Sequence, residues 1–156
     1  YMKSHERIIF VDFGISLDEK SIAQCFEKHE GVGCLVFPGV KEGIDWELFK
    51  HKVQSGSTEP TEQMGLNFDT EIGAKISDDI YKVKTTTSKA WCMNTKNVIK
   101  SIKDKKSGKW TINPKMFAKF TEQGVRIYAF TAAKLVMTYT HECISNILNA
   151  AGIKVN

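Results

Sequence analysis

The sequences R-I-I-F-V-D-F, from Arg7 to Phe13, and V-G-C-L-V-F, from Val32 to Phe37, decide the fold class. Both runs are short, nearly continuous and rich in β-branched and aromatic residues, which is typical of strands buried on both faces of a sheet. Gly14 ends the first run and Pro38-Gly39 ends the second. Two such strands with a helix between them predict a β-helix-β unit whose strands form a parallel pair.

The segment between these strands carries helix signals. Ser16-Leu-Asp-Glu19 matches a capping box, in which the serine hydroxyl and the glutamate carboxylate each accept from a backbone N–H at the helix start. Gly31 predicts the end of the helix. One helical face is apolar and consists of Ile22, Cys25 and Phe26.

Residues 45–80 combine helix and loop signals. Asp45 predicts the N-cap of a short helix with three apolar side chains, Leu48, Phe49 and Val53. Residues 54–63 are polar, contain Gly and Pro, and predict an exposed loop that is long for a compact domain. A helix from about Thr70 is predicted by the four-residue spacing of Ile72, Ile76 and Ile80.

The second half of the chain alternates strand and helix signals. Residues 82–87 predict a strand at an exposed sheet edge, and residues 125–130 predict another strand. One helix is predicted by Val98, Ile99 and Ile102, and a second by Asn113 as N-cap with Pro114 at its first position. Residues 135–140 fit either a hairpin strand or the start of a final helix. That helix would carry Cys143, Ile144, Ile147 and Leu148.

Together these elements predict an α/β fold of three layers, in which helices flank a mixed or parallel sheet. The alternative is an α+β fold with antiparallel hairpins in the second half. The length of 156 residues predicts a single domain over residues 1–156. Tyr1 ahead of Met2 indicates a fragment of a longer protein.

The cysteines and the hydropathy bear on the compartment. No C-x-x-C pair is present, which predicts four reduced thiols in a cytoplasmic or nuclear protein: Cys25, Cys34, Cys92 and Cys143. No apolar run approaches the roughly 20 residues of a membrane helix, so we expect no membrane partner. Phosphate-loop, dinucleotide and serine-nucleophile motifs are absent, so we expect neither a cofactor nor an enzyme of those classes.

Charge is distributed unevenly along the chain. Residues 1–80 hold 8 basic and 15 acidic residues, whereas residues 81–156 hold 14 basic and 3 acidic residues. Such asymmetry favours a nucleic acid or another polyanion as partner. Alternatively, the two halves pack together and neutralise each other.

The basic charge is concentrated between Lys82 and Lys119, a range whose only acidic residue is Asp104. Lysines bind phosphates as flexible point charges, and tryptophans stack on unpaired bases, so we predict a non-enzymatic domain that binds RNA or single strands. Arginine, the usual reader of base edges, occurs once in this half, as Arg126, which argues against sequence-specific recognition of a duplex. The candidate binding residues are Lys82, Lys84, Lys89, Lys96, Lys100, Lys103, Lys105, Lys106, Lys109 and Trp110. Lys115 and Lys119 continue the same charge.

Two other functions fit the same sequence. The first is a protein-interaction or self-assembly module that meets an acidic partner or a second copy through its basic half. The second is a metal-dependent nuclease or phosphotransferase centred on Asp12, which follows the first strand. The stretch Asp12-Phe-Gly-Ile-Ser16 resembles the first phosphate loop of actin-like ATPases and the first acidic site of PIN-type and RNase H-type nucleases. Those nucleases gather several carboxylates on two metals, and the second half offers only Asp104, Glu122 and Glu142.

A further resemblance covers about forty residues, with gaps. From Cys92-Met-Asn-Thr-Lys96 to Gly124-Val-Arg-Ile-Tyr128, the chain is similar to the later part of a macro-like RNA-binding module of coronavirus replicase proteins. The resemblance implies RNA as a ligand. The first half lacks the glycine-rich ligand loops expected of macrodomains.

Overall fold

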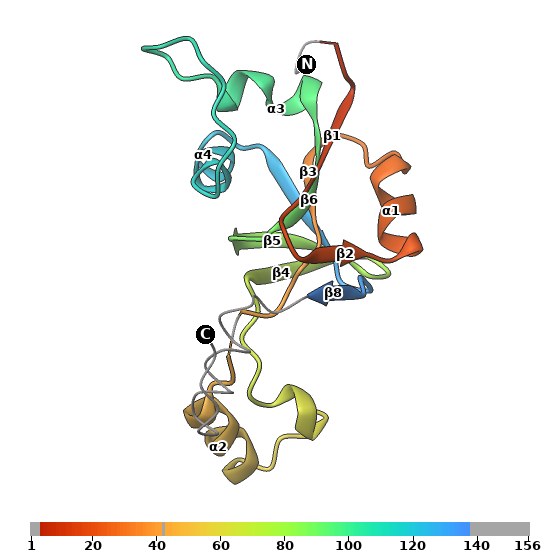
Figure 1. Ribbon diagram of the computed structural model, residues 1–156, viewed down its shortest axis with the longest axis vertical. Helices are drawn as coiled ribbons and strands as arrows, with labels where there is room; N and C mark the ends of the chain where they lie inside the picture. The colour runs from red at the N-terminus through yellow and green to blue at the C-terminus, as the bar shows by residue number, and fades with distance from the viewer. Residues whose placement is uncertain (1–3, 42, 138–156) are drawn as a thin grey trace, which may run out of the picture.

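The computed structural model describes residues 4–41 and 43–137, and its centre is a six-stranded mixed sheet (Figure 1). Only β3 and β7 run parallel to each other, and every other neighbouring pair is antiparallel. In order across the sheet, the strands are β1 (Arg7–Val11), β6 (Ala90–Asn94), β3 (Val32–Val36), β7 (Arg126–Phe130), β5 (Ile80–Thr86) and β4 (Thr70–Ser77). A separate antiparallel ribbon consists of β2 (Ile15–Leu17) and β8 (Leu135–Met137).

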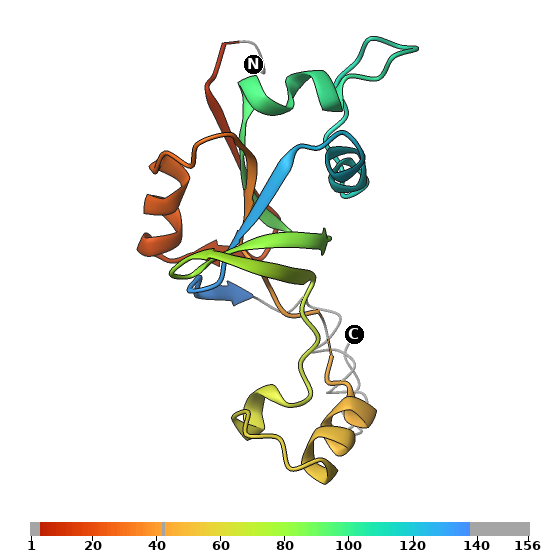
Figure 2. The same cartoon turned by 180° about the vertical axis from the view of Figure 1, so that it is seen from behind.

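Helices cover both faces of the sheet, as the two opposite views show (Figures 1 and 2). Helix α1 (Glu19–Phe26) and the β2–β8 ribbon lie on one face, and α3 (Thr95–Ile102) and α4 (Met116–Glu122) lie on the other. Each face has its own hydrophobic cluster. The predicted three-layer fold with a mixed sheet is therefore confirmed.

Strand β3 is the centre of this core, and all five of its residues are buried. Because side chains alternate along a strand, Cys34 and Val36 join the cluster under α3 and α4, whereas Leu35 joins the cluster under α1. The continuous apolar run in the sequence thus predicted a strand buried on both faces, and the structure confirms it.

The neighbours of β3 differ from the prediction. β1 and β3 point the same way, but β6 lies between them and pairs antiparallel with both, so they are not a parallel pair. Residues 90–94 carry no strand prediction, because Ala-Trp-Cys-Met-Asn lacks the β-branched residues that mark strands. β6 is nevertheless almost entirely buried.

The predicted helix from Thr70 is wrong, because residues 70–86 form the β4–β5 hairpin. A spacing of four residues is also a multiple of the two-residue repeat of a strand, so the isoleucines fit either element. The turn at Asp79, which has a positive φ of 60°, separates Ile76 in β4 from Ile80 in β5. The sheet edge predicted for residues 82–87 belongs instead to β4.

The predicted capping box is also wrong. Ser16 lies in β2, opposite Val136 of β8, and α1 begins three residues later, at Glu19. Asp18 is the N-cap and its carboxylate accepts from the N–H of Ser21 at 3.1 Å. The helix predicted at Asp45 is confirmed, because Asp45 caps α2 (Trp46–Gln54). Helices α3 and α4 are also present, but the predicted start of α4 is wrong: its N-cap is Lys115, and the Asn113 side chain accepts from the N–H of Lys115 at 2.9 Å in the turn before the helix.

Residues 40–69 form an excursion from the sheet that holds α2 and a short 3-10 helix, Thr61–Gln63 (Figure 1). Its two ends are joined where it leaves the sheet: the backbone N–H of Lys41 donates to the carbonyl of Asn67 at 2.7 Å, and the backbone N–H of Asp69 donates to the carbonyl of Gly39 at 2.9 Å. Residues 135–137 are a strand, as one of the two alternatives predicted. The predicted final helix with Cys143, Ile144, Ile147 and Leu148 lies outside the described residues.

Candidate nucleic-acid interface

Residues 103–110 form a basic arm that projects from the sheet between α3 and α4 (Figure 1). The arm is a closed turn in which Lys103 forms a β-bridge with Trp110. The backbone N–H of Asp104 donates to the carbonyl of Lys109 at 2.8 Å, and the N–H of Gly108 donates to the carbonyl of Asp104 at 2.9 Å. Its sequence, K-D-K-K-S-G-K-W, carries four lysines and one acid. The arm therefore displays a net positive charge on an ordered backbone.

Asp104 organises this arm from within. Its carboxylate accepts from the N–H of Lys106 at 2.9 Å, and from the N–H and hydroxyl of Ser107 at 2.7 and 3.1 Å. These hydrogen bonds, led by the one from the Ser107 N–H, lower the pKa of Asp104, and the charge of Lys119 lowers it further. The sequence analysis missed this role, although an Asp followed by a Ser-Gly turn is the signal for it.

Helices α3 and α4 add lysines because their inner sides belong to the core under the sheet. Lys96 and Lys100 of α3, Lys115 at the start of α4 and Lys119 within it are all exposed. Lys100, Lys103, Lys105 and Lys106 line one shallow hollow beside Asp104. We use the name basic face for Lys96, Lys100, Lys103, Lys105, Lys106, Lys109, Lys115 and Lys119.

Three of the candidate lysines lie elsewhere. Lys82 of β5 is opposite Tyr128 of β7, whose side chain packs in the cluster under α1, so Lys82 is on the other side of the sheet from α4. Lys84 forms an ion pair with Glu71 at 3.1 Å. Lys89 lies in the loop before β6, where its carbonyl accepts from the N–H of Asp12 at 2.9 Å. The structure therefore separates these three lysines from the other predicted binding residues.

The two tryptophans of this region have different environments. Trp110 is 37% exposed at the base of the basic arm, with the Lys103 Nζ 5.7 Å from the centre of its ring. Trp91 is buried in the core, stacked on Phe10 and edge-on to Phe117. Only Trp110 is therefore placed where a base can reach it.

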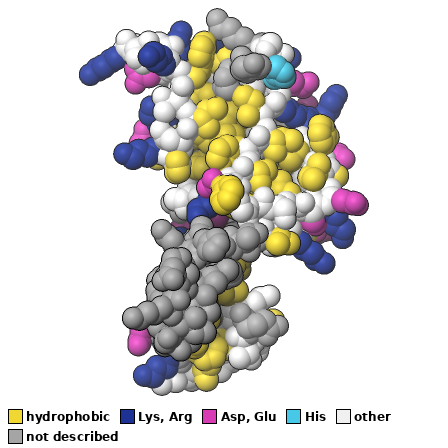
Figure 3. Space-filling view, in the orientation of Figure 1, with side chains coloured by type: hydrophobic (Ala, Val, Ile, Leu, Met, Phe, Trp, Pro, Cys, Tyr) yellow, Lys and Arg dark blue, Asp and Glu magenta, His cyan; other side chains and the backbone are white. Residues whose placement is uncertain are grey.

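Within residues 4–41 and 43–137, no ion pair joins an acidic residue of the first half to the basic face. Residues 4–41 and 43–137 contain three ion pairs, and two of them, Lys52–Glu59 and Lys75–Asp78, lie wholly within the first half. The third is Lys84–Glu71. Within the described part of the chain, no lysine of the basic face forms an ion pair. Figure 3 shows dark blue side chains projecting at the α3 end of the molecule.

Asp12 follows β1 and its carboxylate accepts from the N–H of Phe13 at 2.8 Å. β1 is an edge strand whose sole neighbour among the described residues, β6, is antiparallel. No group of three or more His, Cys, Asp or Glu side chains suited to a metal occurs among the described residues. Glu142, one of the acids considered with Asp12, lies outside them.

No family model, no curated protein and no solved structure matches this chain. Among the described residues, no helix has the length and apolar character needed to cross a bilayer. Cys25, Cys34 and Cys92 are free and buried, as predicted, and Cys143 lies outside the described residues.

Proposed function

We propose that this protein is a non-enzymatic domain that binds single-stranded RNA through the basic face. The observation that carries the proposal is the concentration of eight exposed lysines on α3, α4 and the basic arm. These lysines form no ion pair with the described acidic residues, so each can neutralise a phosphate and release its counterion.

The shape of the basic arm favours single strands. A single strand offers unstacked bases beside its phosphates, and Trp110 lies at the base of the arm next to Lys103. The chain has two arginines, and Arg7 already donates to the carbonyl of Cys25. Because arginine makes most specific contacts to base edges, we expect binding with little sequence preference.

Neutralising the arm tests the proposal. The triple variant Lys105→Gln, Lys106→Gln and Lys109→Gln removes three exposed charges without touching Asp104, which holds the turn. We expect the slope of log affinity against log salt for a fluorescein-labelled single-stranded RNA to become shallower by about 2, at about 0.7 per phosphate contact. Fluorescence anisotropy over a range of salt concentrations measures this slope.

The matched control is the triple variant Lys20→Gln, Lys41→Gln and Lys50→Gln. It loses the same charge from exposed positions on α1, the excursion and α2. We expect its salt slope to stay that of the natural protein. An equal decrease of the salt slope in both variants would show that RNA is attracted by net charge alone. Competition by duplex RNA or heparin that is as strong as competition by single strands would show that the protein does not recognise strand geometry. Either result would overturn the proposal.

Self-association through β1 is a second candidate function, and a specific observation favours it. The two edges of the sheet differ in protection against pairing with another chain. β4 has three register shifts and carries the exposed pairs Glu71–Lys84 and Lys75–Asp78. β1 is regular and apolar, with Ile9 and Val11 43% and 40% exposed, and Phe13 beyond it is 92% exposed. A second copy pairing through the same edge would bury these side chains.

A further inference from the structure

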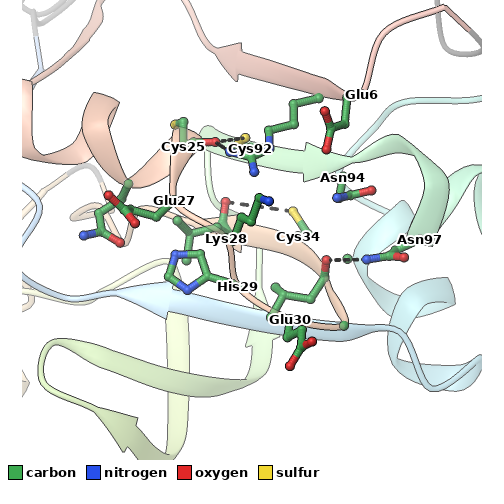
Figure 4. Close-up of a pocket in the computed structure, with 16 residues that line it drawn as sticks. Glu6, Cys25, Glu27, Lys28, His29, Glu30, Cys34, Cys92, Asn94 and Asn97 are labelled. Atoms are coloured by element: carbon green, nitrogen blue, oxygen red, sulfur yellow. Dashed lines mark hydrogen bonds between the residues drawn. The ribbon is translucent and has the colours of Figure 1, made fainter.

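A pocket of about 220 Å³ lies between the end of α1, the loop 27–31 and the strands β1, β3 and β6 (Figure 4). Three cysteines line it, one each from α1, β3 and β6, together with Arg7 and His29. The pocket is separate from the basic face, because none of the eight lysines of that face lines it. Its space admits water-sized molecules.

The Cys92 thiol and the Arg7 guanidinium meet at the backbone carbonyl of Cys25. The Cys92 thiol donates to the carbonyl of Cys25 at 3.7 Å, and the Arg7 Nη1 donates to the same oxygen. The Cys25 thiol donates back to the Ser21 carbonyl of its own helix at 3.5 Å. Two thiols and a guanidinium from three different elements therefore converge beside the pocket.

The surroundings of the three thiols shift their pKa values in different directions. The interaction between the two thiols lowers the pKa of Cys92, and the positive charge of Arg7 lowers it further against the effect of burial. The same interaction and burial raise the pKa of Cys25. Burial raises the pKa of Cys34. A thiol with a lowered pKa beside a second thiol is the arrangement of redox-reactive cysteines.

His29 makes the pocket suited to a small hydrogen-bonding molecule. Its Nε2 is buried and has no hydrogen-bond partner among the described residues. Burial lowers the pKa of His29, and the Arg7 charge contributes in the same direction against Glu27, so the ring is neutral at pH 7. A buried ring nitrogen without a partner in the protein is satisfied by water or a molecule of similar size.

We propose that Cys92 and Cys25 form a peroxide-reactive dithiol that closes to a disulfide between β6 and α1. The Cys92 thiolate attacks one oxygen of hydrogen peroxide, the O–O bond breaks, and the second oxygen leaves as hydroxide and takes up a proton to become water. The resulting sulfenic acid of Cys92 is then attacked by the Cys25 sulfur. The S–S bond forms, the S–O bond breaks, and the oxygen leaves as water with the Cys25 proton.

The disulfide changes how α1 is held. Ser21 and Cys25 are the two buried side chains of α1, and the apolar side chains Ile22 and Phe26 on the same helix are 45% and 69% exposed. A covalent bond from Cys25 to β6 therefore ties a lightly anchored helix to the sheet. Closure requires the Cys25 thiol to leave the Ser21 carbonyl.

Peptide mapping of the full chain tests the proposal. Reduced protein carrying Cys143→Ser is treated with hydrogen peroxide at pH 7, then denatured in the presence of N-ethylmaleimide and digested without reductant. We expect a linked Cys25–Cys92 peptide, two hydrogens lighter than its parts, while Cys34 of the same pocket stays alkylated. Sulfinic Cys92 without a link, oxidation of Cys34 at an equal rate, or all three thiols unreacted would overturn the proposal.

Variants of Arg7 test its electrostatic role, because a purely structural role of Arg7 would leave the pH dependence of the peroxide reaction unchanged. The groups that act on Cys92 are Arg7 of β1 and Cys25 of α1, and His29 in the adjoining loop lines the same pocket. Cys34 of β3 also lines the pocket, but its side chain packs on the opposite face of the sheet from Cys92. With Arg7→Gln, we expect the pH of half-maximal peroxide rate to rise, and the rate at pH 7 to fall about tenfold per unit of pKa. Arg7→Lys keeps the charge and restores the rate. An unchanged pH profile with Arg7→Gln in folded protein would contradict the role of Arg7.

Discussion

Gly33 allows β3 to pass close beneath its neighbours in the core. A Cβ at this position would lie 2.2 Å from the Val125 Cγ1 and 3.0 Å from the Val98 Cγ1, distances at which atoms overlap. Val98 is buried in α3, so neither neighbour can move without disturbing the cluster under that helix. The absence of a side chain at Gly33 thus sets how closely α3 packs on the sheet.

Gly33→Ala should therefore destabilise the fold by overpacking. We expect the free energy of unfolding to fall by about 1–3 kcal/mol, measured by urea denaturation followed through tryptophan fluorescence. Gly73→Ala in β4 is the matched control, because its Cβ would meet the Lys84 Cγ at 3.5 Å, an ordinary contact. Equal stabilities of the two variants would contradict the close packing at β3.

Helix α1 depends on its N-cap, because few of its side chains are buried. The hydrogen bond from the Ser21 hydroxyl, and then that from the Ser21 N–H, lower the pKa of Asp18. A carboxyl whose pKa is lowered by folding stabilises the protein fully above its unfolded pKa, and the contribution is lost as the pH falls through the folded pKa. The cap therefore acts at neutral pH and weakens in acid.

Asp18→Ala is accordingly expected to lower the urea midpoint at pH 7, and its difference from the natural protein should shrink as the pH falls below 3.8. Asp18→Asn keeps a capping oxygen and should retain most of the stability at pH 7. Ser16→Ala is the control, since Ser16 lies in β2 and caps no helix. A larger decrease of the urea midpoint with Ser16→Ala than with Asp18→Ala would instead support the predicted capping box at Ser16.

At the scale of the whole molecule, the two sheet edges predict different behaviour in solution. The double variant Ile9→Lys and Val11→Lys places charge on β1, and we expect it to abolish any rise of molar mass with concentration in light scattering. Ile76→Lys on β4, where the natural residue is 44% exposed, is the control and should change nothing. Association that survives the β1 variant would exclude this edge as the interface.

The residues of the candidate site show where sequence reasoning succeeds. The lysines of the basic face are exposed as predicted, because a run of like charges must face water. Lys82 was assigned to the same surface, yet the register of β5 with β7 turns it to the opposite side of the sheet. Closeness in the sequence does not show whether a strand residue and a nearby helix lie on the same face of a sheet.

Local sequence was sufficient to predict that β3 is buried on both faces, that Asp45 starts a helix, and that positive charge is concentrated in the second half. These properties follow from local periodicity, capping and composition. Three other features could be seen only in the folded chain: β6 separates β1 from β3, the lysines are divided between two faces, and Cys92 contacts Cys25. Those contacts join residues far apart in the chain, so they depend on which buried surfaces fit together rather than on the pattern of any one segment.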